Sequence, residues 1–165
     1  MTTIEQPTVT RQVYFHDASA PVPTRVVPSV FVVVRRANGS LLLVRRRDSG
    51  AWELPGGQVD VGESAVEAAV REAAEESGVQ VAVTGMVGLF TDPGHVVRGA
   101  DGRVRQQFAV LLRARAVGGD PHGDGHETSA AAWVDTADLP GLTIEPAIRG
   151  WIASALAVGE TPHLG

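Results

Sequence analysis

Residues 64–77 restrict the fold more than any other stretch of the chain. They contain neither glycine nor proline, and their apolar side chains recur at the spacing of an α-helix. Ser64 and Glu67 match a capping box, and Gly78 stands where a left-handed residue closes a helix. We expect one apolar stripe to pack on a sheet: Val66, Ala69, Val70 and Ala73. The sequence therefore predicts an amphipathic helix with both ends defined.

Three glutamates share one side of this predicted helix. At about 100° per residue, Glu72, Glu75 and Glu76 fall within an arc of about 100°, at the edge of the apolar stripe. Like charges at this spacing repel, and Arg71 can pair with Glu75 four residues later but leaves the other two unneutralised. Divalent cations that prefer oxygen ligands, Mg²⁺ or Mn²⁺, would remove the repulsion. A cluster of this kind is by itself more often a solvated acidic face. The residues around it must therefore show whether it is a metal site.

The residues around the cluster have a defined spacing. Gly57 is followed after five residues by Glu63, and after seven more by residues 71–79, which read Arg-Glu-Ala-Ala-Glu-Glu-Ser-Gly-Val. This pattern resembles the Nudix box, the signature of hydrolases that act on a nucleoside diphosphate linked to another moiety. Residues 52–57 and 133–139 look like the flanking segments of that family. Ala73 departs from the pattern, which usually has a larger aliphatic residue there, and this affects core volume more than chemistry.

The resemblance implies a site built around metal ions. It makes Glu72, Glu75 and Glu76 carboxylate ligands of Mg²⁺, with Mn²⁺ as a substitute, and adds the backbone carbonyl of Gly56. Glu127 is a further candidate ligand from a later loop. Bound cations offset the negative charge that protects a phosphoanhydride and lower the pKa of a bound water. The implied reaction is hydrolysis of a pyrophosphate bond by attack of water at phosphorus.

The same resemblance assigns supporting roles. Arg71 would orient Glu75, and Glu63 would brace Arg71 or the loop before the helix. A general base must take the proton of the attacking water, and the candidates are Glu75, Glu76 and Glu127. Members of the family differ in this residue, so the choice of base stays open.

Arginine is the side chain best shaped for phosphate, and several arginines are candidates for binding the substrate. Arg45, Arg46 and Arg47 end a predicted strand before the box, and alternation sends Arg46 to the opposite face from its neighbours. We name Arg46 and Arg45 as candidate substrate-binding residues, although a solvated strand end explains them equally well. The same two interpretations hold for three later arginines: Arg98, Arg103 and Arg105.

Two other groups of residues have simpler explanations than a site. His122 and His126 lie among aspartates in a segment rich in glycine, which favours a solvated loop over a metal site. Trp52, Trp133 and Trp151 could stack on a base, but each belongs to an apolar pattern, so we expect them to pack in the core.

The order of predicted elements is strands, helix, strands, helix. Residues 29–36 and 40–47 predict two strands joined as a hairpin through Asn38-Gly39, a pair that suits a type I′ turn. Two long strands that pair, a short strand and a second helix follow at residues 79–90, 104–117, 131–135 and 146–158. This order favours an α/β (α+β) fold, and the resemblance implies the Nudix fold, a mixed β-sheet sandwiched between helices.

The chain divides into three parts. We expect an N-terminal arm at residues 1–24, a Nudix hydrolase domain at 25–159 and a C-terminal tail at 160–165. Within the arm, residues 11–15 can add an edge strand to the sheet. The arm could also join two copies of the chain as a homodimer.

The composition of the chain limits which partners it can bind and in which compartment we expect it. The net charge of −5 gives no broad basic surface for a long nucleic acid, so we expect a small nucleotide-type substrate. The absence of cysteine removes disulfides and thiolate chemistry and suits a reducing compartment. No apolar run approaches the roughly 20 residues of a membrane span, and the start lacks a secretory pattern. We therefore expect a cytoplasmic protein with no membrane partner.

Two functions are compatible with these patterns. The first is a metal-dependent pyrophosphohydrolase, and the alternative is a catalytically weak Nudix domain that binds or senses a nucleotide. Such binding domains generally lose glutamates of the box, and this chain keeps them all. The patterns do not select one nucleoside diphosphate derivative as the substrate.

Overall fold

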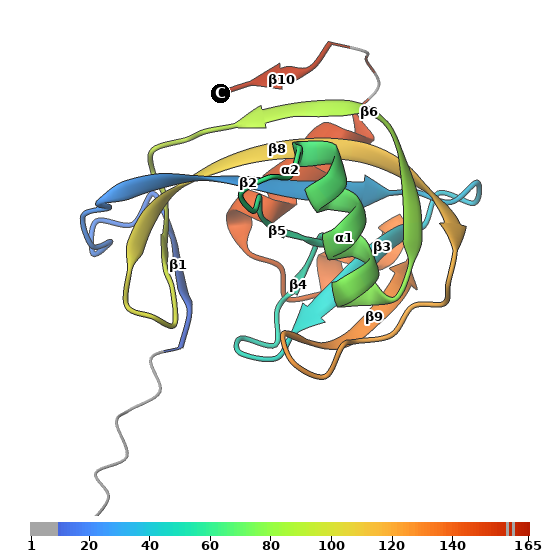
Figure 1. Ribbon diagram of the computed structural model, residues 1–165, viewed down its shortest axis with the longest axis horizontal. Helices are drawn as coiled ribbons and strands as arrows, with labels where there is room; N and C mark the ends of the chain where they lie inside the picture. The colour runs from blue at the N-terminus through green and yellow to red at the C-terminus, as the bar shows by residue number, and fades with distance from the viewer. Residues whose placement is uncertain (1–9, 158, 160) are drawn as a thin grey trace, which may run out of the picture.

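The structure, a computed structural model, describes residues 10–157, 159 and 161–165. Two β-sheets and the helices around them make up this part of the chain (Figure 1). In chain order the elements are β1 (Gln12–Phe15), β2 (Arg25–Val34), β3 (Leu41–Arg46), β4 (Trp52–Glu53), β5 (Gly56–Gln58), α1 (Ala65–Ser77), β6 (Gln80–Phe90), β7 (His95–Arg98), β8 (Val104–Gly118), β9 (Thr128–Val134), the 3₁₀ helix η1 (Thr136–Gly141), α2 (Pro146–Leu156) and β10 (His163–Leu164).

The larger sheet is mixed and is centred on the long strand β8. Strand β2 runs parallel to β8 on one edge, while β7 and β6 pair antiparallel with successive parts of β8. The strand order is β1-β7-β8-β2-β5, and β6 also pairs with β10. The smaller sheet has the order β4-β3-β9. The predicted pairing of the two long strands is confirmed, since they form β6 and β8.

Strand β2 shows why this sheet lies between helices. Its successive side chains point to opposite faces, and both faces are apolar. Val30, Val32 and Val34 pack in the cluster that includes α1, while Phe31 and Val33 pack in the cluster that includes α2. Figure 1 shows α1 in front of the sheet and α2 behind it. The predicted fold class, a mixed sheet sandwiched between helices, is confirmed.

Helix α1 begins and ends at the predicted residues. The side chain of Ser64 accepts a hydrogen bond from the N–H of Glu67, and the Glu67 carboxylate accepts one from the N–H of Ser64. Gly78 closes the helix with φ 71° in the left-handed region. These caps hold the glutamate-bearing turns in register with the loop before the helix.

The predicted packing stripe of α1 is wrong at two positions. Val66 and Val70 are exposed at 48% and 37%, whereas the buried side is formed by Ala68, Ala69, Ala73, Glu76 and Ser77. The helix is thus rotated so that Glu76 lies within the buried arc instead of at its edge. Small alanines on this side bring the helix backbone close to the sheet, and the site and the core share one face of α1.

The predicted hairpin at Asn38-Gly39 is also wrong. Strands β2 and β3 belong to different sheets, and between them the chain has the isolated bridge of Arg35 with Leu41 and the hydrogen bond from the N–H of Arg36 to the carbonyl of Ser40. Gly39 has φ 91°, but Asn38 is not in the positive-φ region that a type I′ turn needs at both positions. The reason is that β8 and β5 already pair with the two edges of β2, so β3 must pair elsewhere.

The ends of the described chain add strands to the larger sheet. Residues 12–15 of the predicted arm form β1, which pairs with β7 at the edge of the sheet, and β10 pairs with β6. Residues 1–9 of the arm, Val158 at the predicted end of the second helix and Glu160 in the tail lie outside the described residues. No helix in the described part is long and apolar enough to cross a membrane.

Candidate active site

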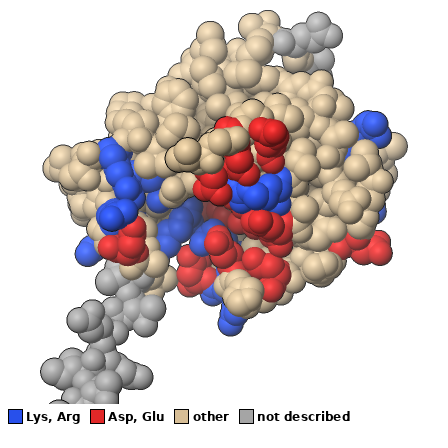
Figure 2. Space-filling model, in the orientation of Figure 1, with Lys and Arg blue, Asp and Glu red and all other residues tan. Residues whose placement is uncertain are grey.

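The glutamates of α1 meet the loop that leads into β5. The backbone N–H of Gly56 donates a hydrogen bond to Oε2 of Glu76 over 2.9 Å, and Glu76 is only 3% exposed. Glu72 lies one turn earlier on α1, beside Gly57. Figure 2 shows the acidic side chains gathered on one face of the molecule, with arginines among and beside them. The predicted cluster is therefore a real grouping in three dimensions.

Burial makes the charged form of these carboxylates costly. It raises the pKa of Glu76 to about 9, and the nearby carboxylates of Glu53, Glu72 and Glu127 act in the same direction. Burial also raises the pKa of Glu72, although its hydrogen bond from Arg71 opposes the shift. These surroundings favour the neutral form of Glu76, and a bound cation would favour its charged form instead.

Arg71 binds more carboxylates than the sequence predicted. Its Nε donates to Glu63 over 2.5 Å, and its Nη1 donates to Glu72 over 2.9 Å and to Glu75 over 3.1 Å. The contacts with Glu63 and Glu75 are the predicted ones, but the expectation that Glu72 stays unneutralised is wrong. Its Nη2 reaches the carbonyl of Gln58 over 3.3 Å, so one guanidinium ties the helix to the loop before it.

The two glycines of the loop are needed because of close neighbours. A Cβ atom at Gly57 would lie 2.4 Å from Oε1 of Glu72, and one at Gly56 would lie 2.3 Å from the carbonyl oxygen of Val30. The backbone contact at Gly56 is not compatible with a side chain, and at Gly57 a side chain would displace the carboxylate of Glu72. The absence of side chains at Gly56 and Gly57 is what lets the loop touch both the sheet and the glutamates.

The structure separates the two arginines that the sequence proposed for the substrate. Arg46 lines the cavity beside the glutamates, where it pairs with Asp48 over 2.8 Å and with Glu53 over 3.1 Å. Arg45 is exposed, does not line that cavity and donates to the carbonyl of Gly50. Alternation along β3 explains the difference, as predicted for Arg46. Arg45 therefore has no contact with the candidate site.

Sequence reasoning missed two buried polar residues of this cavity, Glu53 and Gln107. Each is 3% exposed, and Oε1 of Gln107 has no hydrogen-bond partner in the described part of the chain. Glu53 lies within residues 52–57, which resemble a flanking segment of the Nudix family, so this segment could have pointed to it. Gln107 belongs to a strand with no motif. Strand pairing alone brings Gln107 beside β2 and into the cavity.

Glu127 lies at the cavity, whereas the nearby histidines form no site with it. Its carboxylate lines the cavity, and its backbone N–H is held by Oδ1 of Asp124 over 2.9 Å. Asp124 also accepts hydrogen bonds from the N–H groups of His126 and Thr128, which orders the turn. These hydrogen bonds give the loop an ordered turn around Asp124.

The cavity beside the glutamates has a volume of about 260 Å³. In the residues that the structure describes, no three His, Cys, Asp or Glu side chains already stand together as a metal site. Arg71 accounts for this, because it holds Glu72 and Glu75 in the place of a cation. The donors still fit Mg²⁺, since they are carboxylates that repel one another around the buried Glu76.

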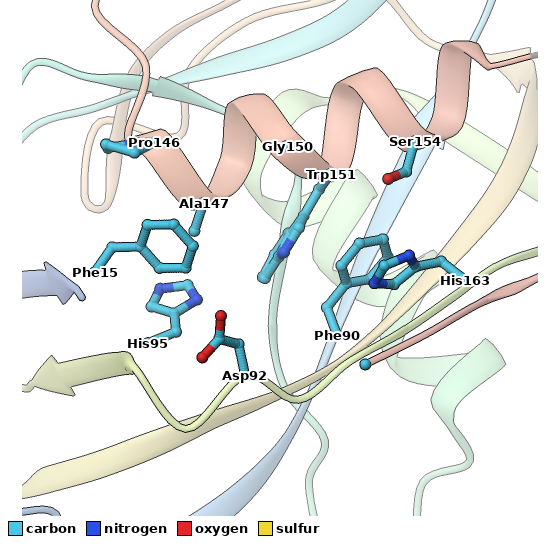
Figure 3. Close-up of a pocket in the computed structure, with 11 residues that line it drawn as sticks. Phe15, Phe90, Asp92, His95, Pro146, Ala147, Gly150, Trp151, Ser154 and His163 are labelled. Carbon is cyan, nitrogen blue, oxygen red and sulfur yellow. The ribbon is translucent and has the colours of Figure 1, made fainter.

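A second pocket, of about 400 Å³, lies beneath α2 and has an aromatic lining (Figure 3). Trp151 packs against Phe31, Phe90 and His95 at ring distances of 5.0, 5.4 and 5.6 Å. Burial lowers the pKa of His95 to about 4, so its ring is neutral at pH 7. Trp151 is 5% exposed and packs in the core, as expected. This pocket contains none of the box glutamates.

Comparison with known proteins assigns a family to this arrangement. Residues 25–155 match the NUDIX domain. A protein of Bacillus subtilis strain 168, provisionally named an 8-oxo-dGTP diphosphatase, is 39% identical over 110 residues, which cover 67% of each chain. An ADP-ribose pyrophosphatase of Methanocaldococcus jannaschii is 30% identical over 122 residues, covering 72% of this chain and 68% of the relative.

A solved structure shows the same fold at lower identity. The crystal structure of a NUDIX hydrolase from Nitrosomonas europaea superposes with a TM-score of 0.65 at 20% identity. The superposition covers 79% of this chain and 70% of that one. At this identity the likeness concerns the fold alone.

Proposed function

The chain belongs to the NUDIX family of hydrolases, and on this premise we propose that it uses a divalent metal ion to hydrolyse a phosphoanhydride bond. The substrate class is a nucleoside diphosphate linked to another moiety, in line with the names of its relatives. One observation carries the proposal. A buried Glu76 is held against Gly56, and the carboxylates of Glu53, Glu72 and Glu127 repel it.

Glu72 and Glu76 are the best placed groups to hold Mg²⁺, with the carbonyl of Gly56 and the carboxylate of Glu75 as further ligands. When bound, the ion would neutralise the phosphates and acidify a water molecule. Gly56 fixes Oε2 of Glu76, so this carboxylate needs little reorganisation to bind an ion. Arg71 holds Glu72 in the apo protein and keeps its position on the helix.

Three residues were candidates for the general base, and their surroundings differ. Glu75 is bound by Arg71 and its side chain is 59% exposed, while Glu76 accepts the hydrogen bond from Gly56. Glu127 lines the cavity, and its carboxylate accepts no hydrogen bond from a described residue. We therefore favour Glu127 as the group that takes the proton of the attacking water, because it is free to receive one.

A substrate panel tests the proposed function. Oxidised and ordinary nucleoside triphosphates, ADP-ribose, nucleotide sugars, dinucleoside polyphosphates, NADH and coenzyme A are incubated with Mg²⁺, and the released phosphate species are measured. Hydrolysis of at least one compound that requires Mg²⁺ and is lost in Glu76→Gln supports the proposal. Tight binding of a nucleotide without hydrolysis would instead support the sensing alternative.

A measurement without turnover tests the metal separately. A ligand that binds only the folded state stabilises it by about 2.7 kcal/mol at one hundred times its dissociation constant. We expect Mg²⁺ to raise the melting temperature of the wild-type protein and to have a much smaller effect on Glu72→Gln. Equal shifts in both proteins would contradict a site at Glu72.

A further inference from the structure

An open pocket of about 700 Å³ adjoins the glutamate cavity and is rich in arginine. We call it the arginine pocket, after Arg11, Arg25, Arg46, Arg47 and Arg105. Arg11, Arg46 and Arg105 line both this pocket and the glutamate cavity. In Figure 2 the arginines lie directly beside the acidic cluster. A molecule bound at the glutamates can therefore extend into this pocket.

Four parts of the fold bring these arginines together, and one of them is the end of β3, which supplies Arg46 and is followed by Arg47. Arg25 and Arg105 are opposite each other on the parallel strands β2 and β8. Arg11 immediately precedes β1, at the edge of the same sheet. No single segment of the sequence contains all of these arginines. The fold collects positive charge at one place although the chain has a net charge of −5.

The positive charge of this pocket is only partly balanced by the protein, since its five arginines share the lining with Asp48, Asp101 and Glu127. Arg46 is paired with Asp48 and Glu53, but Arg105 has no ion pair among the described residues. Arg25 comes only within 4.0 Å of Asp101. The Nε atoms of Arg25 and Arg105 are buried and have no hydrogen-bond partner in the described part. Buried charged donors without partners destabilise a fold, so an external anion is the expected partner.

The electrostatics agree with this geometry. Burial lowers the pKa of Arg105 from its ordinary value, and the neighbouring positive charges of Arg11, Arg25 and Arg46 act in the same direction. Arginines gain when a phosphate is placed among them, because the guanidinium donates paired hydrogen bonds to its oxygens. The pocket is thus prepared for an anion with several oxygens, close to the bond that would be cleaved.

We propose that the arginine pocket binds a further phosphate group of the substrate, beyond the two phosphates joined by the reacting bond. The inference rests on the proposed function, which places that bond at the glutamates. A nucleoside triphosphate has a third phosphate for the pocket, whereas ADP-ribose has an uncharged ribose in that position. Of these two kinds of substrate, which the names of the relatives suggest, the pocket therefore favours nucleoside triphosphates over ADP-ribose.

A binding experiment tests the pocket without turnover. Inorganic tripolyphosphate is titrated into the full-length protein by calorimetry, with EDTA present so that metal ions play no part. We expect binding that weakens at high salt and that is at least about tenfold weaker in Arg105→Gln. Arg115→Gln is the matched control, since Arg115 is an exposed arginine on the same strand and lines neither cavity. Equal affinity in all three proteins, or no binding to the wild type, overturns the proposal.

A folding control and a kinetic readout complete the test. Removing Arg105 relieves repulsion, so Arg105→Gln should melt at the wild-type temperature or above it, and a lower value would indicate a structural role instead. With Mg²⁺, the ratio of kcat/KM for 8-oxo-dGTP to that for ADP-ribose should fall at least about tenfold in Arg105→Gln, mainly through KM. An unchanged ratio contradicts the inference. If the wild type cleaves no compound of the substrate panel, the proposed function fails, while the calorimetry still decides the anion site.

Discussion

The backbone N–H of Gly56 donates to Oε2 of Glu76 over 2.9 Å, across twenty positions of sequence. This hydrogen bond joins the loop after β4 to the last turn of α1. It fixes one oxygen of a buried carboxylate and leaves the other for a different partner.

Glu76→Gln should lower kcat at least about 10²-fold while the protein stays folded. The amide oxygen of glutamine can still accept the hydrogen bond from Gly56, and a neutral amide suits a place where burial already favours the neutral carboxyl of Glu76. We therefore expect a melting temperature equal to or above that of the wild type. Steady-state kinetics and a thermal melt measure the two quantities. Wild-type turnover in Glu76→Gln would exclude this residue as a metal ligand.

Arg71→Lys should lower activity at least about tenfold, although it keeps the charge. A lysine cannot reproduce the fork that holds Glu63, Glu72 and Glu75 together. Loss of these partly exposed pairs should also lower the free energy of unfolding by about 1 kcal/mol. Urea unfolding and kcat measurements check both effects. Arg113→Lys, on β8, is the control and should leave activity unchanged.

Gly57→Ala should damage the site through a single methyl group. Its Cβ would lie 2.4 Å from Oε1 of Glu72, so the carboxylate or the loop must move. We expect at least about a tenfold loss of kcat/KM with little loss of stability, because the atoms displaced are the end of the flexible Glu72 side chain. Gly85→Ala is the control, because a Cβ there meets no atom within 4 Å. If both variants behave like the wild type, the close approach of loop and helix has no role in the site.

Local patterns predicted the part of the molecule that depends on neighbours in sequence. The caps of α1 and the contact of Arg71 with Glu75 follow from spacing along a helix and are present in the structure. The contact of Arg71 with Glu63, which the family resemblance implied, is present as well. Their partners lie within one or two helical turns or the adjoining loop. Periodicity is sufficient for such contacts because the helix fixes the geometry.

Features that depend on strand pairing were not predictable in the same way. Gln107 and Arg105 reach the site because β8 runs parallel to β2. Arg105 was a candidate for binding phosphate, but nothing in the sequence placed either residue beside the glutamates. The hairpin prediction failed for the same reason, since a local turn signal does not say which edges of β2 are already paired. The rotation of α1 that buries Glu76 and exposes Val70 is likewise set by the sheet below the helix.

His95 should make stability depend on pH. Burial lowers its pKa to about 4 in the folded protein, with Arg11 and Arg105 acting in the same direction and Asp92 against it, while the unfolded value is about 6.5. Between these values the unfolded chain binds a proton that the folded protein does not. The stability that His95 contributes in its neutral form is therefore complete above about pH 6.5 and is lost as the pH falls towards 4.

The expected loss from this residue is roughly 2 kcal/mol between about pH 7.5 and pH 5. It is measured as the free energy of unfolding in urea at the two pH values, in the wild type and in His95→Gln. Glutamine has no proton to gain in this range, so its loss of stability should be smaller by about that amount. Equal losses in the two proteins would mean that His95 takes up its proton as readily in the folded state as in the unfolded one. The aromatic pocket below α2 would then not exclude a charged ring, contrary to its burial in the structure.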